Sequence, residues 1–533
     1  MSGTTSISEA GGEKTTPSSD RPKQTYQPAQ DLILDIATGI SVGLEDYSKT
    51  TELVPQIVQP YELVLVVGGT SYSIVVVQNF IEGTELKNTL LSLSLEGSKS
   101  IGADWKSSWK DFEDEALFAG VKFSDLSQKE LDGLVHKFVR KVTQQIFDLL
   151  DGLKIRPSQI GRITCSVAGP VENGSFSSTN MKIPFTAVQL AERIRNAFNR
   201  EKKVEILRSI VRVNGAPSVE AFQAVSAELN IVDELSPSSE IFNDGLCALA
   251  GEVAHDRGKL RNSKKGIAVI IGTGIGGAGY SCLAKEFGHC VLYNTETHKY
   301  EWKSIKELEE LGSFNGDWLK APAGYQYFEH RASGPFGAIR FIKSLYEQNA
   351  ELLKAFANLP CNDTTISFER LKELALLPEE DVDQWAEKTS DHMIRPIVGF
   401  IKDSREKYIN GDVFDDSEMG SLRSYANDYA LKWFKEIGQG LNCIHSQFPN
   451  HDIVLVSGIS EFFHHKQEDP SIKVTDFLDR VQSEIDGLEE GQLSVSEISA
   501  RDREGIGASV LHALKRVKGV SSDKLSKMLF PKP

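Results

Sequence analysis

The chain has 533 residues, of which 40% are hydrophobic and 25% charged, and these values are ordinary for a globular protein of two or three domains. Acidic residues outnumber basic ones by 75 to 59, and the net charge of −16 argues against binding to nucleic acid or to an anionic membrane surface. The six cysteines form no C-x-x-C pair, and no apolar run reaches the length of a membrane span. We therefore expect a soluble cytoplasmic protein without a zinc framework or disulfides.

The N-terminal segment has the composition of a tail. Residues 1–45 include a stretch rich in Ser, Thr, Gly and Pro, which cannot bury enough apolar surface to fold, so we expect disorder there. Its acidic residues Glu9, Glu13 and Asp20 argue against a transit peptide.

Short apolar runs that end in glycine-containing turns predict buried strands in three places. They are Leu63–Val67 before Gly68-Gly69-Thr70, Ile267–Ile271 before Gly272-Thr273-Gly274, and Ile453–Val456 before Ser457-Gly458. The first two runs continue into a second strand, at 74–77 and at 278–282, and so predict a strand–turn–strand unit each.

Apolar residues spaced three and four apart predict amphipathic helices over 131–149 and 430–444, and a last helix is expected around 506–516. Thr186 and Gln189 have the spacing of a capping box, which predicts a helix beginning just after Phe185. Strands interleaved with helices indicate the α/β class.

The glycine turns are candidate phosphate sites, because backbone N–H groups can approach an anion closely where no Cβ intervenes. Gly272, Gly274 and Gly277 also satisfy G-x-G-x-x-G, the pattern of dinucleotide-binding folds. That pattern must open a helix, whereas residues 278–282 read as a strand, so a dinucleotide fold is not favoured.

Taken in order, the segments from residue 68 onward resemble bacterial-type glucokinases of the actin-like, hexokinase-related superfamily. The resemblance assigns two phosphate turns and an adenosine turn, at Gly68, Gly69 and Thr70, at Gly272, Thr273 and Gly274, and at Ser457 and Gly458. It assigns a sugar site to Thr179, Asn180, the Asn243-Asp244 pair, Glu286 and His289 of an E-x-G-H motif, and Glu329, four residues before Ser333-Gly334-Pro335.

This resemblance implies a two-lobed actin-like (RNase H-like) sugar kinase fold, with a small lobe over 60–243 and a large lobe over 244–515 whose C-terminal helix returns to the small lobe. It implies ATP and Mg²⁺ as cofactors and phosphorylation of glucose, or another hexose, at the 6-hydroxyl. Asp244 is then the general base that accepts the hydroxyl proton. A small-molecule sugar is the expected partner, and a homodimer is a candidate assembly.

Each residue also has a simpler interpretation when it is considered alone. Asn243 and Asp244 are both favoured helix N-caps, His289 suits a structural histidine, and Glu286 and Glu329 suit solvated charges. Their joint occurrence, in order and with these spacings, favours the site.

Val66 departs from the family pattern D-x-G-G-T, in which an Asp helps to hold Mg²⁺ through water. Two functions therefore stay open: an active glucokinase, and a non-catalytic sugar-binding sensor or regulator on the same fold. The related repressor branch is disfavoured, because no cysteine-rich zinc motif follows His289 and no basic helix pair precedes residue 60.

Overall fold

The computed structural model describes the chain in segments, and the tail expected over 1–45 lies outside them. The described residues are 61–68, 71–78, 99–101, 106–108, 127–169, 171–178, 185–214, 237–255, 257–263, 265–279, 287–311, 321–359, 366–378, 391–415, 417–456, 458–464 and 476–515.

The first sheet is built on a hairpin, as the glycine turn after residue 67 predicts. Its strand order is β3-β2-β1-β5-β9, with β4 also paired to β2. β2 runs antiparallel to β1, whereas β5 and β9 follow on the other side in parallel pairing. The strands are β1 (Tyr61–Val67), β2 (Ser71–Gln78), β3 (Lys99–Ile101), β4 (Lys106–Ser108), β5 (Ile160–Val167) and β9 (Ser238–Asn243).

The two faces of this sheet bury different helices, because successive side chains of a strand point to opposite sides. Leu63, Leu65 and Val67 pack with α4 (Gln128–Gly152) and α5 (Leu190–Asn214). Val64 and Val66 face the other way, toward α7 (Asp244–Ala254) and α19 (Ala500–Lys515). An unbroken apolar strand is thus explained by helices on both faces.

The second sheet repeats the plan of the first. Its order is β11-β10-β15-β16, with β11 antiparallel to β10 and the other two strands parallel. The strands are β10 (Gly266–Ile271), β11 (Ile275–Gly279), β15 (Asp452–Val456) and β16 (Leu493–Val495). Both sheets therefore contain an antiparallel hairpin whose first strand is paired, on its other side, with a parallel strand.

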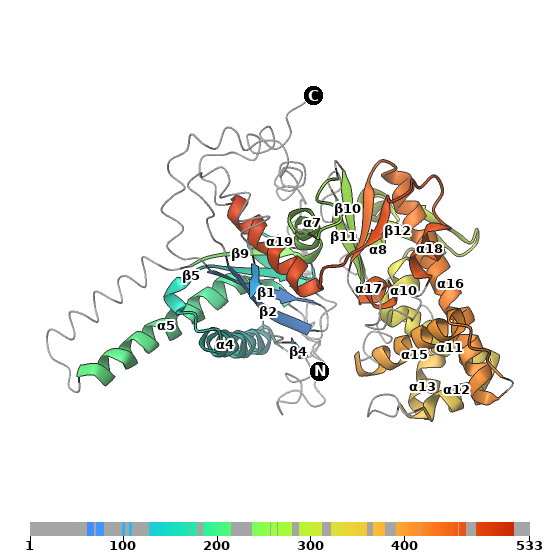
Figure 1. Ribbon diagram of the computed structural model, residues 1–533, viewed down its shortest axis with the longest axis horizontal. Helices are drawn as coiled ribbons and strands as arrows, with labels where there is room; N and C mark the ends of the chain where they lie inside the picture. Colours follow the sequence, from blue (N-terminus) through green and yellow to red (C-terminus); the bar gives the residue numbers. More distant parts are fainter. Residues whose placement is uncertain are drawn as a thin grey trace, which may run out of the picture.

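α7 and α19 lie between the two sheets. One hydrophobic cluster joins apolar residues of β1 and β2, of both helices, and of β10, β11 and β15, among them Val64, Leu246, Ala268, Val454 and Leu511. Figure 1 shows the two helices in the centre, with β1 and β2 on one side and β10 and β11 on the other. The expected α/β class is confirmed, because helices and strands alternate along the chain and pack in mixed layers.

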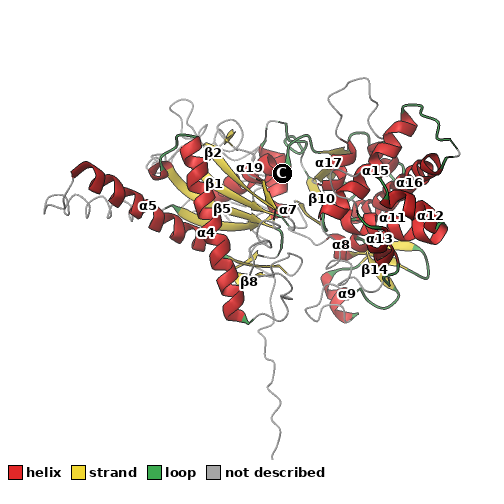
Figure 2. Cartoon of the chain, turned by 90° about the horizontal axis from the view of Figure 1, so that it is seen from below, coloured by secondary structure: helices red, strands yellow, loops and turns green. Residues whose placement is uncertain are grey.

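The outer face of the second sheet is covered by a large helical layer, visible on the right of Figure 2. Its core contains Phe341, Trp433 and Phe434. The predicted helix over 430–444 is confirmed within α16 (Glu418–Gln447). The other helices of this half are α8 (Phe287–Cys290), α9 (Ile305–Glu310), α10 (Glu329–Ala332), α11 (Gly334–Gln348), α12 (Ala350–Ala357), α13 (Phe368–Ala375), α15 (Asp391–Ile409), α17 (Gly458–His464) and α18 (Phe477–Gln482).

Two small three-stranded sheets complete the fold. One contains β12 (Val291–Asn294), β13 (Lys299–Trp302) and β14 (Tyr325–Tyr327), and the other contains β6 (Val171–Glu172), β7 (Ser175–Ser178) and β8 (Phe185–Val188). β8 corrects the helix start expected after residue 185, since α5 begins only at Leu190. Val188 pairs with Phe176 and is buried beside it, so strand pairing overrides the local capping pattern.

A buried polar network holds the end of α19 on the first sheet. Glu62 accepts hydrogen bonds from Thr164 of β5 and from Ser509 of α19, and it also contacts His512 of α19. Burial alone would raise the pKa of Glu62, but Arg162, whose Nε lies 2.8 Å from Oε2, and His512 lower it to about 2. The folded state therefore keeps a buried anion that ties α19 to β1 and β5.

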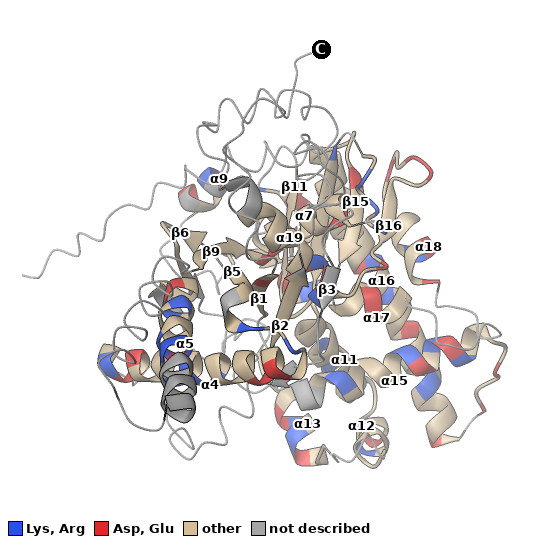
Figure 3. Ribbon diagram, turned by 60° about the vertical axis from the view of Figure 1, so that its left-hand side comes forward, with Lys and Arg blue, Asp and Glu red and all other residues tan. Residues whose placement is uncertain are grey.

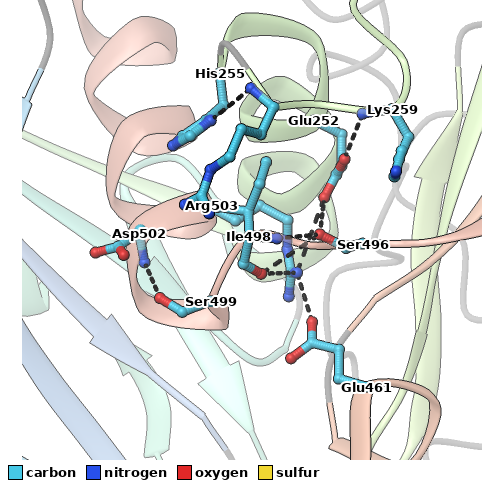
Figure 4. A network of polar contacts seen from close by, with 10 residues as sticks. Glu252, His255, Lys259, Glu461, Ser496, Ile498, Ser499, Asp502 and Arg503 are labelled. Carbon is cyan, nitrogen blue, oxygen red and sulfur yellow. Dashed lines mark hydrogen bonds and ion pairs between the residues drawn. The ribbon is translucent and has the colours of Figure 1, made fainter. Parts of the chain in front are cut away.

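A second network surrounds Arg503 near the start of α19 (Figure 4). Its Nη1 lies 2.6 Å from Oε1 of Glu461 on α17, 3.9 Å from Oε1 of Glu252 on α7, and 3.0 Å from the carbonyl oxygen of Ile498. Glu252 also accepts a hydrogen bond from Ser496. One buried cation thus connects α19, α7 and α17.

Charges on the described helices are mixed in sign. Figure 3 shows basic and acidic residues side by side on α5, α13 and α15. No described helix combines the length and the apolar character needed to cross a lipid bilayer.

Candidate functional site

Three strands of the first sheet end on the same rung. Val67 pairs with Val167, and Val167 pairs with Asn243. Because parallel strands end at a common edge, the turns that follow them meet there, which is where α/β proteins usually bind ligands. Gly68 and Asp244 are therefore brought to one edge, although 176 residues separate them in the sequence.

Asn243 is the N-cap of α7. Its Oδ1 accepts hydrogen bonds from the backbone N–H of Gly245 at 3.0 Å and of Leu246 at 3.4 Å, and its Nδ2 donates to the carbonyl oxygen of Gly169 at 3.1 Å. The capping role that the sequence allows is thus present. It fixes the first turn of α7 and hence the place of the next residue, Asp244.

Asp244 lies where the two halves of the molecule approach each other. A Cβ on Gly245 would stand 2.9 Å from the backbone of Gly277, so the start of α7 touches β11 of the second sheet. Its carboxylate is oriented by the N–H of Gly245, which donates to Oδ1 at 2.8 Å. Burial, reinforced by the charge of Glu504, raises the pKa of Asp244 to about 7. A carboxyl group with this pKa can exchange a proton near neutral pH.

The other two predicted turns, at Gly272–Gly274 and at Gly458, lie at one edge of the second sheet. Ile270 of β10 pairs with Val456 of β15, so the turns after these strands are neighbours. Gly458 has a positive φ of 37°, and a Cβ there would lie 2.9 Å from Cα of Gly272. Thr273 is exposed at the tip of the turn. The turns predicted to hold phosphate and adenosine therefore lie against each other.

Glu329 contacts both the turn at Gly272–Gly274 and the segment that carries His289. Its Oε2 accepts the N–H of Ile275 at 2.8 Å and would stand 2.7 Å from a Cβ on Gly274. Its own Cβ would be 2.9 Å from a Cβ on Gly288, the residue before His289. Burial raises the pKa of Glu329 to about 7. This side chain is therefore an integral part of the second turn, and the interpretation as a solvated charge is wrong.

His289 is buried in an aromatic environment. It is 4% exposed, and its ring contacts Tyr327 edge to face, with the centroids 4.6 Å apart. His330 contacts the same tyrosine, and burial, with the nearby His289 and Arg340, lowers the pKa of His330 to about 3. At neutral pH His330 is therefore uncharged. His289, Tyr327 and His330 together form an aromatic cluster that carries imidazole nitrogens.

Several predicted residues lie outside the described part of the chain: Gly69, Thr70, Thr179, Asn180, Glu286 and Ser457. Their assignments remain predictions. The described ones, Gly68, Asn243, Asp244, Gly272, Thr273, Gly274, His289, Glu329 and Gly458, fall on the carboxyl edges of the two sheets or on elements that touch them.

The sequence gives no indication of one further residue at this place, Glu504 of α19. Burial raises its pKa to about 7, and Ser166 of β5 donates a hydrogen bond to its Oε2 at 3.2 Å. Glu504 is 260 residues from Asp244 in the chain. Only the packing of α19 on α7 brings them together.

The donor groups suit Mg²⁺ that is held mainly by nucleotide phosphates. Mg²⁺ prefers oxygen ligands and commonly takes one or two carboxylates in addition to substrate phosphates and water. Asp244 and Glu504 are such carboxylates, whereas Val66 is a buried apolar residue. Within the described ranges no group of three or more His, Cys, Asp or Glu residues is arranged to hold a metal ion.

Comparison with known proteins gives similarity of structure only. No protein-family model matches the chain, and no curated protein matches it in sequence. A ROK family glucokinase from Streptomyces griseus, solved with glucose and AMPPNP, aligns over 84% of this chain and 98% of its own with 14% identity and a TM-score of 0.40.

A hexokinase from Schistosoma mansoni, solved with glucose, aligns over 91% of this chain and 95% of its own with 12% identity and a TM-score of 0.42. A ROK family transcriptional regulator, a homolog of the E. coli MLC protein, aligns over 88% and 81% with 12% identity and a TM-score of 0.39. The similar structures thus include both kinases and a regulator. The fold of this chain is described by the strand order of its own two sheets.

Proposed function

We propose that this protein is an ATP-dependent sugar kinase of the glucokinase type, which transfers the γ-phosphate of ATP to the 6-hydroxyl of glucose or a similar hexose. The observation that carries the proposal is the position of Asp244. This residue has a carboxyl group of raised pKa, and it lies where the edges of the two sheets approach each other. Strands at both edges are followed by glycine turns.

In the proposed reaction Asp244 accepts the proton of the attacking hydroxyl. A carboxylate of pKa about 7 is a stronger base than an ordinary aspartate and is still ionised to a large extent at neutral pH. The Gly245 N–H holds Oδ1, which fixes the direction of the carboxylate before the sugar arrives.

The remaining groups bind and orient the two substrates. In the proposed complex the backbone N–H groups of Thr273 and Gly274 hold phosphate oxygens, because the Gly272 N–H already donates to the carbonyl oxygen of Gly274. Glu329 and His289 then hold sugar hydroxyls. Mg²⁺, when bound with ATP, would neutralise charge on the transferring phosphate. A site closed to water favours the sugar over hydrolysis.

A second function is supported by Val66. This residue is 8% exposed and belongs to the apolar cluster between the two sheets. It can neither bind nor orient a metal-bound water, which favours a sugar-binding sensor or regulator that has kept the fold and lost the reaction.

Two measurements on the whole chain separate these functions. We expect ADP release from ATP and Mg²⁺ in the presence of glucose, tested against a panel of hexoses, and glucose binding by calorimetry. Glucose binding without ADP release from any hexose would favour the regulator. Neither binding nor ADP release would contradict both proposals.

The contact between Glu329 and the phosphate turn gives a further prediction. Glu329→Ala should weaken both glucose and ATP binding, because it removes a sugar ligand and also the acceptor of the Ile275 N–H. His289→Ala should weaken glucose binding alone, by the order of tenfold or more for the loss of one buried hydrogen bond. Calorimetry with each ligand checks this.

Glu329→Gln serves as the matched control, since its amide oxygen can still accept the Ile275 N–H. It should keep ATP binding near that of the parent protein. If Glu329→Ala left ATP binding unchanged, the carboxylate would not be supporting the turn.

A further inference from the structure

α10 is too short to hold its own position. It has four residues, Glu329–Ala332, and a single helical turn is not stable by itself in water. Glu329 extends from it to the turn at Gly274, where its Oε2 accepts the Ile275 N–H at 2.8 Å. The place of this carboxylate therefore depends on the elements that fix α10.

One face of α16 contacts α10 along its length (Figure 1). Nε1 of Trp433 donates to the carbonyl oxygen of Ala332 at 3.0 Å, and a Cβ on Gly440 would stand 2.2 Å from the ring of Phe328. Glu436 lies between Trp433 and Gly440 in the sequence, at spacings of three and four, so all three residues share this face.

Arg331 binds α10 to the same face. Its Nε donates to Oε2 of Glu436 at 2.9 Å, and its Nη2 donates to Oε1 of Glu436. Its Nη1 donates to Oε1 of Gln326 at 2.7 Å. Burial would raise the pKa of Glu436, but Arg331 and Tyr300 lower it, so the carboxylate stays ionised. Two parallel bonds to one carboxylate fix the orientation of the guanidinium group as well as its distance.

The guanidinium group of Arg331 also covers the ring of Tyr293 in β12, with Cζ 3.6 Å from the ring centroid. β12 follows directly on α8, which carries His289, and it pairs with β14, the strand that precedes α10. Arg331 thus joins the segment that bears Glu329 to the segment that bears His289.

We propose that Arg331 is a positioning residue for the candidate sugar site: it sets the place of Glu329 relative to His289. It does so through the Arg331 clamp, by which we mean its contacts with Glu436 and Tyr293. The effect on sugar binding rests on the proposed function, whereas the effect on the glycine turn that Glu329 supports does not.

The chain offers a matched control, a second clamp of nearly the same build. Arg405 of α15 binds Asp476, the N-cap of α18, through Nε at 2.9 Å and Nη2 at 2.6 Å, and its Nη1 donates to Oδ1 of Asn427 at 2.7 Å. The two arginine side chains are similarly buried, 10% exposed in Arg331 and 4% in Arg405. No predicted site residue lies on α15 or α18.

The first test needs no substrate. Arg331→Lys keeps the positive charge but cannot form two parallel bonds to Glu436, so α10 should shift and the Ile275 N–H should lose protection. Hydrogen exchange followed by mass spectrometry should be several-fold faster across 272–279 than in the parent protein. Arg405→Lys, compared at the same interval below its melting temperature, should leave this segment unchanged. Equal exchange in the two variants would mean that the Arg331 clamp only stabilises the fold, and would overturn the proposal.

The second test is glucose binding by calorimetry, which applies to a kinase and to a sensor alike. Arg331→Lys should raise the Kd for glucose by about tenfold, the effect of losing one buried hydrogen bond, and Arg405→Lys should keep the parent Kd. Glu436→Gln, whose single amide oxygen can accept only one of the two bonds, should act in the same direction and replaces Arg331→Lys if that variant does not fold. A parent Kd in both Arg331→Lys and Glu436→Gln would overturn the proposal.

The two tests fail separately. If the parent protein binds no hexose, the proposed function fails, and hydrogen exchange still decides whether Arg331 positions Glu329. If glucose binds and the variants at Arg331 and Arg405 behave alike in both tests, the proposed function stands and the role of Arg331 is rejected.

Discussion

Asp244→Asn is expected to lower the turnover of ADP release by about 10²–10⁴-fold, the usual contribution of general acid–base catalysis. The amide has nearly the shape of the carboxylate and can still accept the Gly245 N–H through its oxygen. It cannot take up the hydroxyl proton. Steady-state kinetics at saturating glucose and ATP measure the effect on kcat.

Binding and folding provide the controls for this variant. Glucose affinity should fall only moderately, and the melting temperature at pH 7 should not fall, because a neutral side chain removes the unfavourable burial of a charge. Asp479→Asn, which removes an exposed carboxylate from the first turn of α18, should keep parent turnover. An Asp244→Asn protein with parent turnover would exclude Asp244 as the base.

Gly507→Ala is expected to destabilise the protein by at least about 3 kcal/mol, the upper part of the range for overpacked sites. The new methyl group would overlap the backbone carbonyl of Cys247, and backbone cannot move aside as a side-chain end can. α19 would have to shift on α7, which also disturbs Glu504. Urea unfolding followed by circular dichroism measures the change.

Gly133→Ala is the matched control. Gly133 is exposed in α4, and a Cβ there meets no atom within 4 Å. Alanine restricts the conformations of the unfolded chain more than glycine does. The free energy of unfolding of this variant should therefore rise by roughly 0.5–1 kcal/mol. Equal stability of the two variants would show that the α7–α19 contact is not tight.

Local patterns predicted much of the fold. The apolar runs at 63–67 and 267–271 form the first strands of the two hairpins, and the helical spacings at 131–149 and 430–444 form α4 and α16. Such patterns suffice because burial on a strand or helix imposes a short sequence period. The capping pattern at Thr186 failed because its segment is paired to β7, a contact that no local period encodes.

For the site, the sequence by itself determined which residue types lie next to which glycine turns, since those relations are local. It placed Asp244 after Asn243, and Glu329 four residues before Ser333. The tertiary structure alone decided that Glu329 supports the turn at Gly274 and that the charge of Glu504 acts on the pKa of Asp244. The reason is physical: sheet pairing and the glycine-lined helix crossing join segments hundreds of residues apart, and burial between them sets the pKa of each carboxyl group.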